Sequence, residues 1–169
     1  MQKKYYYLPE KVYASKGKRL ANFVIDRIVI YVLTFLMGML AFVLSEALGM
    51  GGFLRFIENM TAMEELLFGV VVSLLYYMAL ESTTGRTIGK FITNTRVISE
   101  NEKKAAPDEV FIRSLCRFIP FDAFSFLGSE GRGWHDSIPK TYVVDIKKYD
   151  EEKQIREGLD QLGANTQEI

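Results

Sequence analysis

Hydrophobic positions gather into two long runs, both before residue 82, and a charged segment of mixed sequence follows them. The first run, Phe23–Leu44, has 22 residues and carries no charge from Ile28 onward. At 1.5 Å per residue it reaches about 33 Å, enough to cross a hydrocarbon core of about 30 Å. The pattern predicts a membrane-spanning helix over about residues 20–45. The run exceeds the apolar region of a secretory signal, so we expect it to be retained.

The second run, Leu66–Leu80, predicts another spanning helix, over about residues 64–81. Its 15 residues cover only about 22 Å, which is short for a span. Either the bilayer thins locally or a flanking glutamate, Glu65 or Glu81, is drawn inward. Between the runs, residues 45–65 are acidic, and the sequence GMGGF indicates a flexible connection.

The segment after the second run predicts shorter elements. β-branched and aromatic residues in TRVIS (95–99) and KTYVVDI (140–146) are typical of two short strands. Apolar residues between them recur at helical spacing over about 107–119, while Arg113 and Arg117 share a different face. This pattern favours an amphipathic helix lying in the membrane interface. A third span continuing through FDAFSFLG (121–128) is the alternative.

These elements predict an all-α membrane protein with two transmembrane helices, one interfacial helix and a short cytoplasmic two-stranded β element. Residues 1–18 are expected to form an extended, Lys-rich arm near the lipid headgroups, with Tyr5–Tyr7 at the interface. Residues 19–145 form the membrane domain. The charged tail, 146–169, is expected to be a solvated helix or disordered.

The distribution of basic residues predicts the orientation in the membrane. Seven Lys and Arg precede residue 28, one lies in the connecting loop, and thirteen follow residue 81. The positive-inside bias therefore places both termini in the cytoplasm and the acidic loop outside.

Composition excludes several classes of function. The net charge is zero, so no basic excess indicates a nucleic-acid partner. The single Cys116 rules out an internal disulfide, and one His with one Cys argues against a zinc site. We therefore expect no metal and no cofactor. The lipid bilayer is the expected partner.

Ionisable side chains of the two predicted spans lie at one depth. Asp26 falls about one turn inside the cytoplasmic edge, and Glu81 falls at the same edge. An ionised carboxylate within a bilayer is costly, which favours pairing. Arg19, seven residues before Asp26, shares its face of the helix. We expect a buried ionic cluster of Arg19, Asp26, Glu81 and at least one later arginine, serving either packing or function.

Three motifs resemble those of the RDD family of small membrane proteins: RLANFVID (19–26), ESTTGRTIGKFITNTRVI (81–98) and RGWHDSIPKTYVV (132–144). Arg19 and Asp26 match the arginine and first aspartate of the family name, and Asp136 is the best match for the second aspartate. The resemblance implies a bacterial inner-membrane protein. For the family, transport has been suggested, including cation/proton exchange for some members.

Two motifs invite an enzymatic interpretation that their details do not support. In GRTIGK, Gly85 and Gly89 enclose three residues where a phosphate-binding loop needs four. We expect instead a turn whose basic residues contact headgroups. His135 in WHD (134–136) lacks a nucleophile-elbow partner, so it and Asp136 are expected to hydrogen-bond locally or join the cluster. The chain is therefore not expected to be an enzyme.

Two functions remain open. In the first, the cluster carries an ion or small solute, with oligomerisation because two helices cannot enclose a pathway alone. In the second, the protein is a non-catalytic scaffold or accessory subunit that docks a partner membrane protein. The candidate residues are Arg19, Asp26, Glu81, Gly85, Thr87, Gly89, Lys90, Arg113, Arg117, His135 and Asp136.

Overall fold

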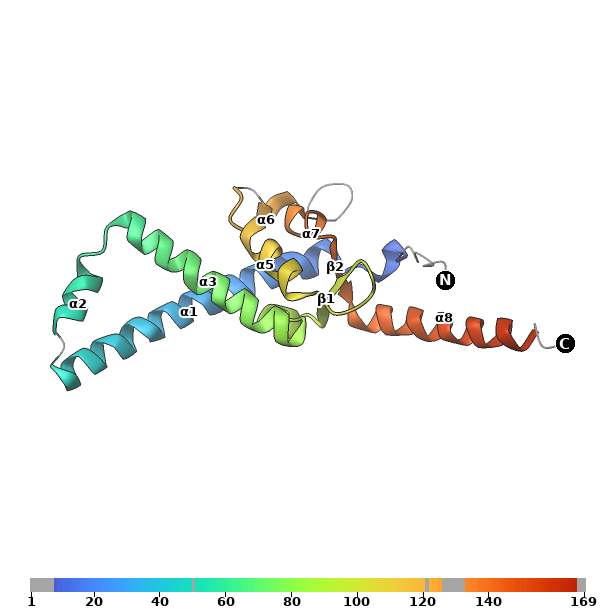
Figure 1. The fold of residues 1–169 in the computed structure, drawn as a ribbon, viewed down its shortest axis with the longest axis horizontal. Helices are drawn as coiled ribbons and strands as arrows, with labels where there is room; N and C mark the ends of the chain where they lie inside the picture. The colour runs from blue at the N-terminus through green and yellow to red at the C-terminus, as the bar shows by residue number, and fades with distance from the viewer. Residues whose placement is uncertain (1–7, 50, 121, 126–132, 167–169) are drawn as a thin grey trace.

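The computed structural model describes residues 8–49, 51–120, 122–125 and 133–166 (Figure 1). In chain order the elements are η1 (Glu10–Val12), α1 (Lys16–Leu48), α2 (Gly51–Glu58), α3 (Ala62–Thr84), α4 (Ile88–Ile92), β1 (Thr95–Ser99), α5 (Pro107–Cys116), α6 (Asp122–Ser125), α7 (Trp134–Ser137), β2 (Thr141–Asp145) and α8 (Ile146–Thr166). The two predicted long apolar helices, the two strands and the helix between the strands are present.

The two long helices, α1 and α3, have well-defined ends. Ser15 caps the start of α1, and a capping box of Thr61 and Glu64 begins α3. Both helices end at a glycine in the left-handed region, Gly49 at φ 66° and Gly85 at φ 70°. With 33 and 23 residues, each is long and apolar enough to cross a membrane.

The second helix is longer than its uninterrupted apolar run. Its 23 residues reach about 34 Å, the length that a span requires. Glu81, one of the two flanking glutamates, is completely buried among protein groups.

Helices α1 and α3 present apolar side chains outward along most of their length. Phe35 is 71% exposed and Leu75 is 63% exposed, and exposed apolar surface of this extent is typical of membrane or protein contact. The helices cross where Ile30 packs with Val72 and Tyr76. They separate toward α2 at the far end (Figure 1).

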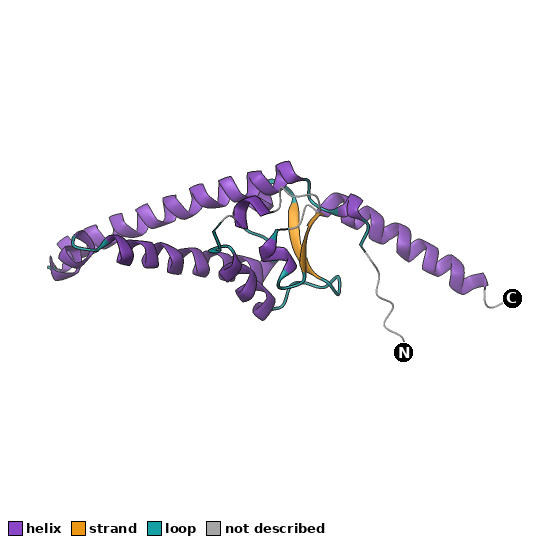
Figure 2. Cartoon of the chain, turned by 90° about the horizontal axis from the view of Figure 1, so that it is seen from above, coloured by secondary structure: helices purple, strands orange, loops and turns teal. Residues whose placement is uncertain are grey.

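The short elements at the other end form what we call the base, the described residues among 8–18 and 85–145. Strands β1 and β2 pair antiparallel, with Val97 opposite Val143. Val12 packs into the core of this sheet with Val144 and Ile98. Figure 2 shows the sheet between the long helices and α8.

The N-terminal segment is more ordered than expected. Leu8 and Val12 are buried, and Tyr13 forms a β-bridge with Val144. The prediction of an extended arm is therefore wrong for residues 8–18, which form part of the base; their position near headgroups stays a prediction. Tyr5–Tyr7 lie outside the described residues.

Helix α5 is amphipathic in the way the sequence indicates. Its 10 residues cover only about 15 Å, too short for a span. Phe111, Ile112 and Leu115 are exposed, whereas Arg113 faces inward and is 1% exposed. Among the described residues, the candidate spans by length and composition are α1 and α3. Residues 121 and 126–128 of the third-span alternative lie outside the described residues.

Two helices occur where the sequence indicated irregular structure or left it open. Helix α2 lies within the connection predicted to be flexible, and Gly51 and Gly52 are part of that helix. The tail forms α8, which ion pairs fasten to the base: Lys11 with Glu152 at 2.7 Å and Arg156 with Glu102 at 2.6 Å. Of the two alternatives for the tail, the helix is correct.

A close approach of α4 to α1 gives a first prediction. A Cβ added at Gly89 would lie 2.7 Å from the carbonyl oxygen of Asn22 and 2.9 Å from Oδ1 of Asp26. We expect Gly89→Ala to destabilise the protein by about 1–3 kcal/mol, because helix backbones must move apart. Thermal unfolding in detergent measures this.

The matched control is Gly69→Ala, because nothing lies within 4 Å of a Cβ added there. Alanine has the higher helix propensity, so this variant should be as stable as the wild type or more stable. Equal melting temperatures for Gly89→Ala and the wild type would contradict the close packing of α4 on α1.

Candidate functional site

The candidate site begins on a single polar face of α1. Arg19, Asn22 and Asp26 are all buried, and their spacing of three and four residues places them on one side of the helix. This face turns toward the base. Asp26 lies ten residues after Lys16, the first residue of the helix.

Neutral donors surround the carboxylate of Asp26. Its Oδ1 accepts hydrogen bonds from the hydroxyl of Tyr76 and the backbone N–H of Gly89, each at 2.8 Å. Its Oδ2 accepts from the hydroxyl of Thr87 at 2.7 Å. Asp26 thus fastens α1 to α3 and α4. The expectation that Asp26 pairs with an arginine is wrong, because these three donors occupy its oxygens.

Glu81 occupies the ionic position that the sequence assigned to the inner end of the spans. Its carboxylate contacts Lys90 Nζ at 2.6 Å, and Arg113 Nε and Arg117 Nη2 at 3.1 Å each. Glu81 and Lys90 are 0% and 3% exposed by side chain. Lys90 is therefore an internal ion-pair partner, and the prediction that it contacts lipid headgroups is wrong.

Asp136 completes the chain of ion pairs. It accepts from Arg19 Nη1 at 2.5 Å and from Arg113 Nη1. Arg113 also donates to the hydroxyl of Thr141 at 3.0 Å. One guanidinium therefore bridges Glu81 of α3 and Asp136 of α7, while Arg19 joins α1 to the same aspartate.

His135 is held next to this chain by Asp122. Its Nδ1 lies 2.6 Å from Asp122 Oδ2, and its backbone N–H donates to Oδ1 at 3.0 Å. Burial, reinforced by Arg117 and Arg113, lowers the pKa of His135 well below its usual value. Burial also raises the pKa of Asp122. The two contacts with Asp122 hold the His135 ring beside the ion pairs.

We refer to the buried ionisable groups as the charge cluster. It contains four basic residues and four carboxylates, which are Arg19, Lys90, Arg113, Arg117, Asp26, Glu81, Asp122 and Asp136. Equal numbers of opposite charges satisfy the requirement that buried charges be paired. The structure thus brings together the seven charged candidates, although Asp26 takes part through neutral donors.

The remaining candidates shape the turn between α3 and the sheet. Gly85 ends α3 at φ 70°, and its carbonyl accepts from the N–H of Val97 at 2.9 Å. Thr87 caps α4, accepting from the N–H of Lys90 at 3.4 Å while its hydroxyl donates to Asp26. Gly89 leaves room for α1. The segment GRTIGK (85–90) is thus a turn that packs against α1 and places Lys90 in contact with Glu81.

Sequence reasoning did not identify Tyr76 and Asp122. Tyr76 donates to Asp26 from within an apolar run, where an aromatic residue indicates packing alone. Asp122 was visible only as a single acid in FDAFSFLG, without a signal for its pairing with His135. No group of three or more potential metal ligands occurs among the residues the structure describes.

The base holds cations whose proton affinities differ. Burial lowers the pKa of Lys90 to about 8, with Glu81 opposing the shift. Burial also lowers the pKa of Arg113 to about 10. For Arg117, burial lowers the pKa, but Glu81 together with Tyr77, Asp26 and Asp122 more than offsets it, so that the pKa is raised. Lys90 is therefore the basic group of the cluster that changes charge closest to neutral pH.

Two long apolar helices joined at one end by buried charges are features of a small membrane protein. The family model of the RDD family matches residues 13–140, and the chain belongs to this family, whose members are small membrane proteins. This confirms the resemblance of the three motifs. No curated protein and no solved structure matches the chain.

Lys90 gives a pH-dependent prediction. Its pKa is about 8 in the folded protein and 10.5 when free, so the unfolded state binds more protons at Lys90 between these values. The free energy of unfolding should therefore increase with pH across this window. We expect the melting temperature of the wild type to rise from pH 8 to 10.5 relative to that of Lys90→Met.

Melting curves of both proteins at a series of pH values in detergent measure the difference in melting temperature. Other titrating groups affect both proteins alike, so their contributions cancel in this difference. A constant difference over the whole window would mean that Lys90 titrates like a lysine in water.

Proposed function

We propose that this protein takes part in moving an ion or small solute across a bacterial inner membrane, with cation/proton exchange at the charge cluster. The observation that carries the proposal is the burial of Asp26 and Glu81, both about 1% exposed or less, on helices able to span the membrane. Ionisable groups in such helices are costly and mark ion or proton pathways by default.

Lys90 supplies the proton-carrying group in this proposal. Its pKa of about 8 allows it to lose a proton near neutral pH. Deprotonation removes one of the three positive partners of Glu81 and leaves its carboxylate less compensated. A cation entering beside Glu81 would restore the balance, so proton release and cation uptake are coupled through one carboxylate.

The connections of the cluster favour transmission of this change to the spans. Glu81 belongs to α3, and Lys90 lies one residue after Gly89, whose N–H donates to Asp26 of α1. A shift of α4 on loss of the ion pair would therefore act on both long helices.

The proposal includes an orientation and an assembly. Both termini lie in the cytoplasm and the chain crosses the membrane more than once, as the Lys and Arg distribution indicates. Two helices do not enclose a pathway, so several copies or a partner membrane protein complete it. No residue is assigned a catalytic role, and no cofactor is involved.

The alternative is a non-catalytic accessory subunit. It is favoured by the exposed apolar faces of α1 and α3, which are able to pack against other membrane helices. In that case the charge cluster only fixes the base on the two helices.

Flux measurements on reconstituted vesicles test the proposal. We expect a sodium or potassium gradient to drive proton movement, reported by an enclosed pH-sensitive dye, in vesicles with the wild type. Asp26→Asn should lose most of this flux, because the neutral amide changes the charge beside Lys90 and adds a donor among three donors. The matched control is Glu46→Gln, which removes an exposed carboxylate from the same helix.

Monodisperse elution and a cooperative melting transition well above the assay temperature establish that each variant is folded before flux is compared. Equal flux for Asp26→Asn and the wild type would remove Asp26 from the mechanism. Absence of proton movement in wild-type vesicles, together with a stable co-purifying membrane protein, would replace transport by the accessory function.

A further inference from the structure

A cavity of about 50 Å³ lies beside the charge cluster. Space of this size holds a group equivalent to a few water molecules. Five basic side chains border it, whereas the acidic residues that border it are Asp26 and Asp122. The basic residues are Arg19, Arg27, Lys90, Arg113 and Arg117. Glu81 and Asp136, which neutralise several of these cations, are not part of the wall. With these two carboxylates counted, the cations still exceed the carboxylates by one, because Arg27 adds to the balanced charge cluster, so the cavity keeps an excess of positive charge.

Three of the arginines at this cavity have unused hydrogen-bonding capacity. The Nε atoms of Arg19 and Arg117 are buried and have no hydrogen-bond partner among the described residues. Arg19 is 6% exposed, so water outside the protein does not satisfy it readily. Arg27 lies over the ring of Phe23 at 5.6 Å and forms no ion pair within the part of the chain that the structure describes. Buried donors and membrane-embedded cations of this kind require an acceptor.

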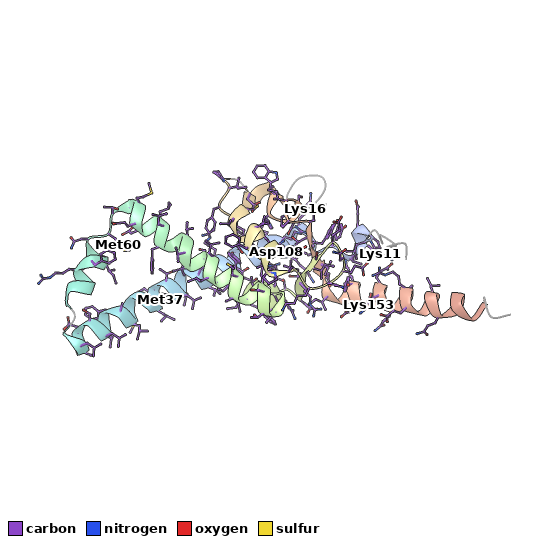
Figure 3. The ribbon with its side chains drawn as sticks, in the orientation of Figure 1. Lys11, Lys16, Met37, Met60, Asp108 and Lys153 are labelled. Carbon is purple, nitrogen blue, oxygen red and sulfur yellow. The ribbon has the colours of Figure 1, made fainter. Side chains whose placement is uncertain are left out.

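A second hollow continues from the cavity. It is an apolar groove of about 740 Å³ along α1 and α3. Arg27, Ser73 and Phe118 border both the cavity and the groove. Met37 and Met60, labelled in Figure 3, border the groove toward α2. The groove thus runs from the basic cavity toward the opposite end of the long helices.

We propose that the cavity and groove together bind one anionic phospholipid, with its phosphate in the cavity and an acyl chain in the groove. Arg27 stands where the two hollows meet, and its guanidinium is suited to bind phosphate oxygens in a bidentate manner. The orphan Nε groups of Arg19 and Arg117 supply further donors. The acyl chain covers the apolar walls that α1 and α3 leave open.

The chemistry of both hollows selects this ligand. A free phosphate would satisfy the arginines and leave the apolar groove unfilled. A lipid with a zwitterionic headgroup would fill the groove, but its own cation would oppose the basic cavity. An anionic phospholipid satisfies both parts. The cavity shares Arg19, Lys90, Arg113 and Arg117 with the charge cluster, but lipid binding is measured without any ion movement, so the two proposals are tested separately.

Native mass spectrometry of the full-length protein in detergent tests the proposal. The probes are phosphatidylglycerol, phosphatidylcholine with identical acyl chains, and inorganic phosphate. We expect the wild type to bind one phosphatidylglycerol about tenfold more tightly than phosphatidylcholine, a difference that one charge-assisted contact is able to supply. Inorganic phosphate should neither bind tightly nor displace the lipid.

Two variants separate the headgroup contact from the chain contact. Arg27→Gln should abolish the preference for phosphatidylglycerol, and the matched control Arg55→Gln, at an exposed arginine of α2, should retain it. A Cβ added at Gly69 meets nothing within 4 Å, so the leucine of Gly69→Leu would extend into the groove. This variant should weaken the binding of both lipids about equally. Arg27 is exposed and outside the charge cluster, so its variant is expected to fold.

Equal affinity of the wild type for both lipids would overturn the proposal, as would an undiminished preference in Arg27→Gln. Displacement of phosphatidylglycerol by inorganic phosphate at similar concentration would identify a free-phosphate site instead. Unchanged lipid binding by Gly69→Leu would place the acyl chain outside the groove.

Discussion

A charge removed from water must be compensated, and in this protein the ion pairs of Glu81, Arg113 and Asp136 provide that compensation at the foot of two apolar helices. Arg113 donates to both carboxylates, and Arg19 reaches Asp136 from α1. Removing one partner from such a buried set leaves an uncompensated charge, at a cost of about 3–5 kcal/mol. The base is therefore held on the helices chiefly by ion pairs, and replacing any one of these charged residues should destabilise the protein.

This arrangement explains how short elements form an ordered base. Two strands of five residues each would be marginal alone. They are stabilised because Asn22 of α1 donates to Thr95 of β1 at 3.0 Å, and because Asp136 and Thr141 share Arg113 at the start of β2. The spans, the turn after α3 and the sheet therefore form one unit. A change in charge at Lys90 would therefore alter the contacts that join the helices, the turn and the sheet.

The sequence predicts the parts of this fold that depend on local pattern. Apolar run length identified α1 and α3, and β-branched residues identified β1 and β2. The spacing of Arg113 and Arg117 separated the basic face of α5 from its apolar stripe. The sequence also predicted that Glu81 lies near later arginines, because the start of the first predicted span and the end of the second lie on the same side of the membrane. Partner choice could not be predicted, since it depends on how α4 turns back: this turn gives Asp26 the donors Thr87 and Gly89. Helix α2 was missed because paired glycines indicate flexibility locally, although here they begin a helix.

The central claim is that ion pairs between distant segments hold the helices to the base. A double-mutant cycle on Arg19 and Asp136, whose side chains are 5% and 0% exposed, tests it most directly. Unfolding free energies of Arg19→Gln, Asp136→Asn and the double variant are compared with that of the wild type, and the exposed pair Lys153–Glu157 serves as the control cycle. The account predicts a coupling energy of about 1–3 kcal/mol for Arg19 with Asp136 and none measurable for the control. Additive effects of Arg19→Gln and Asp136→Asn would contradict it.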